Sequence, residues 1–235
     1  MTVDLNCDLG EGAAHDDELM ALVSSVNIAC GGHAGDQGTM ARALRLAGVH
    51  GVAAGAHPGY EDREGFGRVE CALPAGRVFA LVRGQVEGLR RMATGMAMRL
   101  THVKPHGALY NQAARDPVLA AEVAAAVVAV DPGLVLYGLA GSELVAAGRA
   151  CGLAVAREVF ADRRYRADGL LVPRGAVDAV IAEVEEACAQ VLRLVAGGGV
   201  DTVCVHGDGP DAVVFARRVR AALMAAGVNI RARVP

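Results

Sequence analysis

Residues 3–8 read VDLNCD, and polar side chains take every second position of this stretch. Successive side chains of a β-strand point to opposite faces, so Asp4, Asn6 and Asp8 share one face of the strand that we predict here. A face with two carboxylates and an amide does not suit packing against the apolar side of a helix. The stretch therefore predicts a strand whose polar face lines an enclosed polar space.

Residues 102–106, HVKPH, repeat this alternation with basic side chains. His102, Lys104 and His106 share one face of a second predicted strand. The two strands thus direct polar stripes of different sign toward the same space. The lumen of a parallel barrel that opens onto a cleft accommodates both stripes, whereas a sheet face covered by helices does not.

The rest of the chain alternates short β-like segments with longer helix-like segments, which is typical of an all-parallel sheet. Strands are predicted over residues 3–8, 26–30, 51–57, 100–106, 134–139, 154–160 and 201–206. Helices are predicted, from apolar spacings of three and four, over residues 18–23, 40–47, 76–98, 117–130, 142–150, 176–195 and 211–226. Nearly every strand ends in a polar motif, whereas an open sheet gathers its site at one switch point. We therefore predict an α/β fold, a single-domain parallel (βα)7 TIM-like barrel over residues 1–235.

The composition excludes several other classes of protein. Of the 235 residues, 53% are hydrophobic and 21% are charged, which excludes a disordered chain. The net charge of −3 and the absence of a long apolar run predict neither a nucleic-acid nor a membrane partner. The six cysteines form no CxxC pair and the N-terminus has no signal-peptide pattern, so we expect reduced thiols in a cytoplasmic protein.

The candidate site consists of polar residues at the predicted strand ends, which meet at one edge of a parallel sheet. The main candidates, which come from the ends of four predicted strands, are Asp8, His57, Lys104, His106 and Asp208. Asp8 is a candidate metal ligand or general base, and the alternative is a helix cap or a loop ion pair. Lys104 is a candidate clamp for a carboxylate or a developing oxyanion, and the alternative is a buried ion pair with Asp4 or Asp8.

Histidines and aromatic residues extend this cleft. His102 is expected to be an interior histidine with satisfied hydrogen bonds, whereas the histidines at strand ends are His33, His57, His106 and His206. Five aromatic residues that follow strand-end motifs are Tyr60, Phe66, Tyr110, Phe160 and Tyr165. They line the cleft, face a partner or pack beneath long loops. The chain has no GxxxxGK[ST] motif, so no phosphate-binding loop of that type is predicted.

Seven stretches of the chain, in this order, resemble the LamB/YcsF family of prokaryotic ATP-dependent 5-oxoprolinase A subunits. They are DLNCDLGEG at 4–12, NIACGGHAGD at 27–36, GAHPGYEDREGFGR at 55–68, HVKPHGALYN at 102–111, GLAGSE at 138–143, EVFADRRYRADGLLVPR at 158–174 and CVHGDGP at 204–210. The resemblance implies a seven-stranded βα barrel related to glycoside hydrolase and deacetylase barrels. Compared with the family pattern, the segment before the last motif is short, so we expect Arg174 to lead almost directly into the helix over 176–195.

The resemblance also implies an activity, the cleavage of 5-oxo-L-proline to L-glutamate. This reaction is coupled to ATP hydrolysis in a complex with two further subunits, B and C. A five-membered lactam is an unreactive amide, and phosphorylating its carbonyl oxygen makes that oxygen a leaving group before water attacks. Because this chain has no phosphate loop, we expect the partner subunits to handle part or all of the ATP co-substrate.

On this interpretation the chain contains the site that binds the small acid, 5-oxo-L-proline. Asp8 is expected to act as the general base, with His57 or His106 carrying the proton. Lys104 is expected to pair with the substrate carboxylate or the activated carbonyl oxygen. The opposite rim is expected to contain Glu158, Asp162 and Arg163, and the further substrate-binding candidates are Asn6, Asn27, His33, Tyr110, His206 and Asp208.

Three alternatives stay open. By analogy with barrel deacetylases, Asp8, His33 and His57 are candidate ligands of a divalent metal ion. A second alternative is that the chain acts alone, as a metal-dependent deacetylase or amidohydrolase that needs no ATP. A subunit that only binds the acid and presents it to its partners would instead use the polar cleft for affinity.

Overall fold

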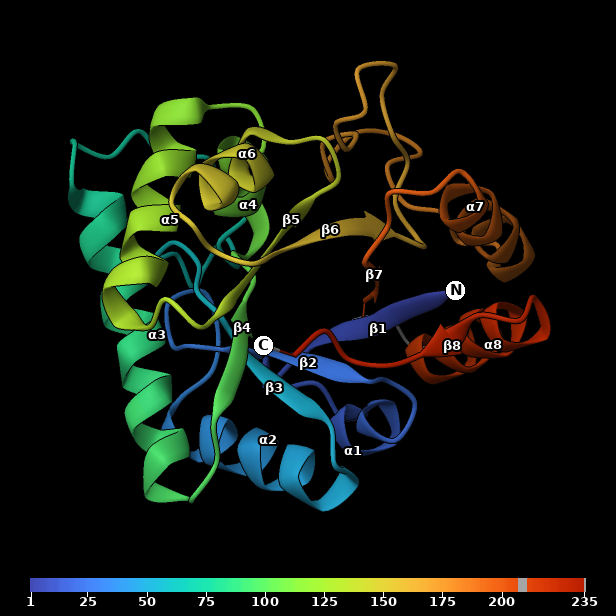
Figure 1. The fold of residues 1–235 in the computed structure, drawn as a ribbon, viewed down its shortest axis with the longest axis horizontal. Coiled ribbons are helices and arrows are strands. Elements are labelled where there is room, and N and C mark those ends of the chain that lie inside the picture. Colours follow the sequence, from blue (N-terminus) through green and yellow to red (C-terminus); the bar gives the residue numbers. More distant parts are fainter. Residues whose placement is uncertain (207–210, 235) are drawn as a thin grey trace.

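The computed structural model describes residues 1–206 and 211–234, and its central feature is a closed ring of parallel strands (Figure 1). The ring consists of β1 (Thr2–Leu9), β2 (Ser25–Ala29), β3 (Ala53–His57), β4 (Leu100–Val103), β5 (Val135–Leu139), β6 (Val155–Phe160) and β7 (Thr202–Val205). β1 pairs with β2 along one edge and with β7 along the other, which closes the ring. The predicted (βα)7 TIM-like barrel is confirmed.

Helices surround the ring (Figure 1). They are α1 (Asp16–Met20), α2 (Gln37–His50), α3 (Arg77–Gly95), α4 (Gly107–Ala113), α5 (Pro117–Val130), α6 (Glu143–Ala150), α7 (Val184–Ala196) and α8 (Ala212–Ala225). The Asp36 carboxylate accepts the Thr39 N–H at the start of α2, which ends at Gly51 in the left-handed region, with φ of 66°. Asp116 caps α5 in the same way. Among the described residues, no helix has the length and apolar character of a membrane span.

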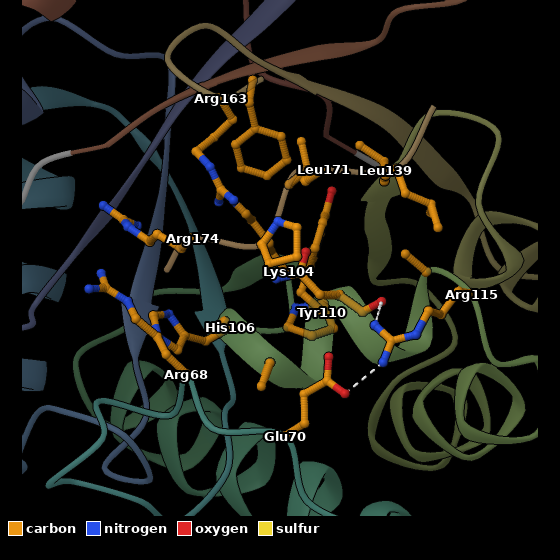
Figure 2. A pocket seen from close by; sticks show the side chains of 18 of the residues that line it. Arg68, Glu70, Lys104, His106, Tyr110, Arg115, Leu139, Arg163, Leu171 and Arg174 are labelled. Carbon is orange, nitrogen blue, oxygen red and sulfur yellow. Dashed lines mark hydrogen bonds and ion pairs between the residues drawn. The ribbon is translucent and has the colours of Figure 1, made fainter. Parts of the chain in front are cut away.

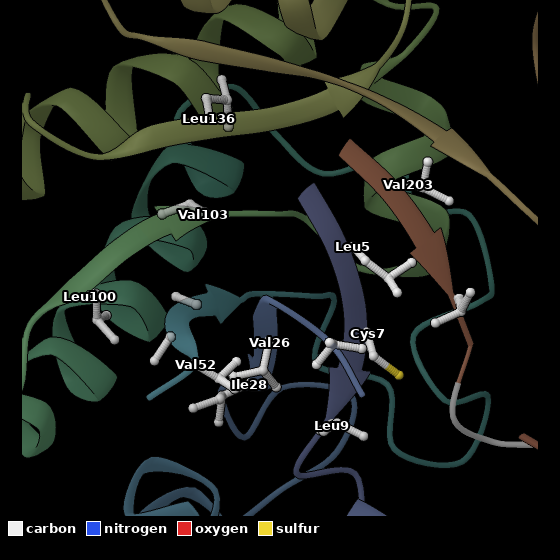
Figure 3. Close-up of a cluster of buried hydrophobic side chains, with 14 of the residues drawn as sticks. Leu5, Cys7, Leu9, Val26, Ile28, Val52, Leu100, Val103, Leu136 and Val203 are labelled. Carbon is white, nitrogen blue, oxygen red and sulfur yellow. The ribbon is translucent and has the colours of Figure 1, made fainter. Parts of the chain in front are cut away.

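The apolar core lies between the strands and the helices (Figure 3). Leu5, Cys7 and Leu9 occupy alternate positions of β1 and are almost fully buried. Apolar side chains of other strands in the same cluster include Val26, Ile28, Val103, Leu136 and Val203. Burying each large aliphatic side chain stabilises the fold by about 1.5–3 kcal/mol. Since these alternate positions supply the apolar core, the intervening ones are free to carry polar groups into the lumen.

Asp4 lies in the part of the lumen nearest the amino-terminal ends of the strands, and its carboxylate is held there by hydrogen bonds. Its carboxylate accepts the hydroxyls of Ser24 at 2.6 Å, Ser25 at 2.7 Å, Thr202 at 2.7 Å and Tyr137 at 3.1 Å. Burial raises the pKa of Asp4, and these four hydrogen bonds oppose the rise. Asp4 therefore ties β1 to three other strands, β2, β5 and β7, and lies away from the mouth of the barrel.

A second layer of hydrogen bonds fills the middle of the lumen. Asn27 Nδ2 donates to Asn6 Oδ1 at 2.7 Å and to Asp8 Oδ1 at 2.8 Å. His102 Nε2 lies 2.8 Å from Asn27 Oδ1, and the His102 ring stacks on Tyr137. Burial lowers the pKa of His102 to about 3, so the ring is neutral. His102 is thus the satisfied interior histidine that the sequence predicted.

We predict that Gly55→Ala destabilises the barrel, because β3 approaches the His102 ring most closely at Gly55. A Cβ at this position would lie 2.2 Å from His102 Nε2. The ring cannot move away without breaking its bond to Asn27. The free energy of unfolding should fall by about 1–3 kcal/mol in urea titrations. Gly84→Ala, on the exposed side of α3, is the control and should be neutral or stabilising; equal effects of the two substitutions would contradict the prediction.

The segment after β6 differs from the sequence prediction. The predicted helix over 176–195 begins only at Val184, as α7. The residues before it fold back onto the segment just after β6, where Ile181 N donates to Asp162 O at 2.8 Å. This pairing overrides the helical propensity of an alanine-rich stretch. Arg174 is therefore followed by a loop, and the expectation that it leads almost directly into a helix is wrong.

The sequence analysis also missed two short elements, α4 and an eighth strand, β8 (Asn229–Ile230). β8 pairs in parallel with the first residues of β1, through Thr2 and Val3. The Val3 carbonyl accepts from Arg231 N, and the Leu5 carbonyl accepts from Ser24 N just before β2. β8 and β2 thus share one edge of β1, one after the other.

Candidate active site at the carboxyl ends of the strands

A cavity of about 760 Å³ opens at the carboxyl-terminal end of the barrel (Figure 2). This volume accommodates a small organic ligand. Of the residues that the sequence analysis singled out, those lining the cavity are Asp8, His57, Lys104, His106, Tyr110, Phe160, Arg163 and His206. The structure therefore brings the ends of five strands, β1, β3, β4, β6 and β7, to one cavity.

Lys104 lies on the cavity floor, directly beyond β4, because the strand predicted over 100–106 ends at Val103. Its Nζ lies 3.0 Å from Asp8 Oδ1 and 3.0 Å from Glu158 Oε1. Burial alone would lower the pKa of Lys104, but the nearby carboxylates outweigh burial and raise it well above its usual value. Lys104 is charged, and the buried ion pair with Asp8 that the sequence left as an alternative is present.

Asp8 connects this ion pair to the histidines. Its Oδ1 accepts from Lys104 and Asn27, and its Oδ2 lies 3.4 Å from His57 Nε2. Burial opposes ionisation of Asp8, but the charges of His57 and Lys104 outweigh it and hold the pKa of Asp8 well below its usual value. One carboxylate oxygen is thus fixed by the lysine, and the other faces the imidazole.

Three histidine rings and Glu11 form a compact group beside Asp8. His106 Nδ1 lies 2.9 Å from His57 Nε2, and the His33 and His106 rings stack with centroids 3.6 Å apart. Glu11 Oε1 lies 3.1 Å from His33 Nε2. The sequence analysis did not name Glu11, because it follows β1 within a glycine-rich turn and not on the polar face of the strand.

The surroundings push the pKa values of these rings in different directions. Burial disfavours the charged form of His57, but the charge of Asp8 and the hydrogen bond that His57 donates to it raise the pKa of His57 overall. Burial and the positive charges of His57 and His33 lower the pKa of His106 well below its usual value. The pKa of His33 is also lowered, mainly by burial. The three rings therefore differ in their tendency to carry a proton.

Two groups of side chains in the described part of the chain bring metal-donor atoms close together. The first is Glu11, His33, His57 and His106, and the second is Asp8, Cys204 and His206. The predicted metal ligands Asp8, His33 and His57 are divided between these groups. In the second group Lys104 Nζ already lies 3.0 Å from both Asp8 Oδ1 and Cys204 Sγ.

One wall of the cavity carries arginines, of which Figure 2 shows Arg68, Arg163 and Arg174. Burial lowers the pKa of Arg163, and the positive charges of Arg174 and Arg68 lower it further, so the three guanidinium groups are electrostatically coupled. Arg163 also donates to Val172 O at 2.6 Å, which ties down the loop after β6. Of these three arginines, the sequence predicted only Arg163 as a site residue. Arg68 and Arg174 lie in loops, at a distance in sequence from any predicted strand end. Converging guanidinium groups favour an anionic ligand.

Other predicted site residues lie at the rim or beneath the floor. At the rim, His206 Nδ1 lies 2.7 Å from Asp162 Oδ2, and this contact lowers the pKa of Asp162 although burial opposes it. Residues that contact the floor from below, without lining the cavity, are Asn6, Asn27 and Glu158. Asp208 lies outside the described residues.

Comparison with known proteins assigns the chain to a family. The model of the LamB/YcsF family matches residues 3–234. The chain belongs to the LamB/YcsF family. Two LamB/YcsF relatives are each named as the A subunit of 5-oxoprolinase. The one from Erwinia tasmaniensis is 51% identical, over 98% of this chain and 99% of the relative. The one from Methylococcus capsulatus is 52% identical, over 98% and 95%.

Solved structures agree with this assignment. The lactam utilization protein from Thermus thermophilus is 44% identical, with a TM-score of 0.91 over 99% of this chain and 100% of that chain. The catalytic domain of a peptidoglycan N-acetylglucosamine deacetylase from Eubacterium rectale is 12% identical, with a TM-score of 0.54 over 100% of this chain and 93% of that one. The second likeness shows that this LamB/YcsF barrel shares the deacetylase-like fold.

Proposed function

We propose that this chain is the A subunit of an ATP-dependent 5-oxoprolinase and that its cavity opens the lactam ring of 5-oxo-L-proline to give L-glutamate. The single observation that carries the proposal is the cavity itself, where the Asp8–Lys104 pair on the floor faces a space with an arginine wall. A small anion with one reactive carbonyl fits this division of charge. The names of the two 5-oxoprolinase relatives support the choice of substrate.

The arginine wall and Tyr110 are the proposed anchors of the substrate. Tyr110 lines the cavity and is 3% exposed, and burial and the neighbouring Glu158 carboxylate raise the pKa of its hydroxyl well above the usual value. The hydroxyl therefore keeps its proton, and a phenolic hydroxyl at this point is a suitable hydrogen-bonding group for a ligand oxygen. Arg163, on the arginine wall, supplies positive charge for a carboxylate or a phosphoryl group of the ligand.

The proposed chemistry starts from a lactam whose carbonyl oxygen has been phosphorylated by ATP. Water adds to the activated carbon, and its proton passes to Asp8, which His57 holds from the other side. Lys104 stabilises negative charge that develops on oxygen. Once a proton has reached the ring nitrogen, the C–N bond breaks and leaves an acyl phosphate. A second water molecule releases phosphate and L-glutamate.

The partner subunits B and C are proposed to carry out the phosphorylation. The chain contains no GxxxxGK[ST] phosphate loop, and its cavity is lined by residues suited to the acid. A proton relay through His57 or His106, as predicted from the sequence, requires these two rings to be free of a metal ion. Measuring whether the full chain binds a metal ion in the absence of substrate distinguishes a proton relay from a metal site.

The proposal is tested by measuring glutamate release from 5-oxo-L-proline, with the chain alone and with both partner subunits, each with and without ATP. We expect release only when all three subunits and ATP are present. Release by the chain alone without ATP would instead identify a stand-alone hydrolase. No release in any mixture would refute 5-oxoproline as the substrate.

A further inference from the structure

His57 Nε2 and His106 Nδ1 face each other at a distance too short for both nitrogens to carry a proton. His57 Nδ1 lies 2.7 Å from the carbonyl oxygen of Lys104, and His106 Nε2 lies 2.9 Å from the carbonyl oxygen of Phe66. A carbonyl oxygen only accepts hydrogen bonds, so each ring carries a proton on its outer nitrogen. The inner nitrogens, 2.9 Å apart, then need either one proton shared between them in a hydrogen bond or a metal ion that both of them bind.

Glu11 and His33 complete the ring of donors around this point. Glu11 Oε1 lies 3.1 Å from His33 Nε2, 3.5 Å from His106 Nδ1 and 3.9 Å from His57 Nε2. One carboxylate oxygen thus faces three imidazole nitrogens. All four donor atoms lie within 4.8 Å of one another, and each histidine is at most 5% exposed.

The group is also held rigidly, as a site for a small ion requires. A Cβ at Gly59 would lie 2.7 Å from His33 Nδ1, and one at Gly67, where φ is 63°, would lie 2.7 Å from His33 Cβ. The chain at these two glycines therefore packs so close to His33 that neither position has room for a side chain. The outer hydrogen bonds of His57 and His106 are of the kind that orient metal-bound histidines.

We propose that Glu11, His33, His57 and His106 bind one divalent transition-metal ion of the Zn²⁺ type. Imidazole nitrogens with one carboxylate are donors that Zn²⁺ accepts in a four-coordinate site. The ion replaces the proton that His57 and His106 would otherwise share, and its charge is balanced in part by Glu11. Because the cavity is lined by His57 and His106, the ion lies directly behind its floor. The assignment is independent of the 5-oxoproline reaction.

The second donor group is a poorer site for such an ion. Its Asp8 and Cys204 already contact the ammonium of Lys104, each at 3.0 Å. A divalent cation placed there would lie next to a buried positive charge, which is costly. We therefore place the ion in the first group alone.

The test is metal binding by the full chain, followed without any substrate. After dialysis to remove loosely bound ions, we expect about one equivalent of metal per chain by mass spectrometry. Zn²⁺ added to chelator-treated protein should raise its Tm, and Co²⁺ should give the visible absorption of a nitrogen-rich site.

Glu11→Gln keeps the size of the side chain and should weaken Zn²⁺ binding about 100-fold or more, as should His33→Gln if it folds. His50→Gln, an exposed histidine outside the group, should bind as the wild type does.

Two outcomes would overturn the assignment. If the folded wild type, confirmed by circular dichroism, takes up neither Zn²⁺ nor Co²⁺, then His57 and His106 share a proton instead. If His206→Gln loses the ion while Glu11→Gln retains it, the ion belongs to the second group. Neither result depends on glutamate release, so the metal site and the proposed function can fail separately.

Discussion

Lys104→Met is expected to lower the free energy of unfolding by about 3–5 kcal/mol, because it leaves Asp8 and Glu158 buried without their shared cation. The lysine is 2% exposed and lies 3.0 Å from a carboxylate oxygen of each partner. Glu158 is fully buried, so water cannot easily replace the lost cation. Urea unfolding followed by circular dichroism measures the loss.

Two further variants separate burial of charge from other effects of this substitution. Adding Glu158→Gln to Lys104→Met removes one of the two carboxylates that have lost their cation and should recover part of the lost stability. Arg164→Met breaks the exposed ion pair with Glu186, where water replaces the lost contact, so its loss of stability should be far smaller. A loss from Lys104→Met no larger than that of Arg164→Met would show that the lumen does not depend on this ion pair.

Asp8→Asn is expected to lower kcat for glutamate release by about 100- to 10,000-fold in the assembled enzyme, because it removes the proposed proton acceptor. Asparagine retains an oxygen for Lys104, which also keeps its contact with Glu158, so the barrel should fold. Steady-state kinetics with the partner subunits measures kcat and KM separately. A raised KM with unchanged kcat would instead indicate that the chain only binds and presents the acid.

Asp4→Asn is the matched control for this substitution. Asp4 lies on the same face of β1, but its carboxylate accepts four hydroxyl hydrogen bonds at the lower end of the lumen. Its replacement should lower stability and leave kcat of the folded enzyme within about twofold of the wild type. A loss of kcat as large as that of Asp8→Asn would show that any carboxylate on this face affects turnover indirectly.

The barrel was predictable because strand faces follow a strict period of two. That rule placed Asp4, Asn6 and Asp8 in one lumen, and it allowed only a closed ring to hold them beside Lys104. It gave no information about Glu11, whose position depends on the turn after β1. Gly10 and Gly12, with φ of 76° and 91°, bend the chain there, and only the folded turn places the carboxylate against the histidines.

The start of α7 was not predictable for a related reason. Residues 176–183 have a composition that favours a helix, and nothing local in the sequence opposes it. In the structure their backbone pairs with the segment just after β6, through contacts such as that between Ile181 and Asp162. Such pairing depends on where β6 ends in space, which a local pattern does not contain.

The pairing of β1 has a consequence for synthesis of the chain on the ribosome. β1 emerges first, but one of its edges is completed only by β7 and the other only by β2 and β8 together. Until residues 202–205 and 229–230 have been made, a nascent sheet has an open edge and its charged interior faces water. Ring closure is therefore a late, long-range event, of the kind that slows folding and exposes strand edges to aggregation. A chain truncated before β7 should need a chaperone to stay in solution, however complete its first six strands are.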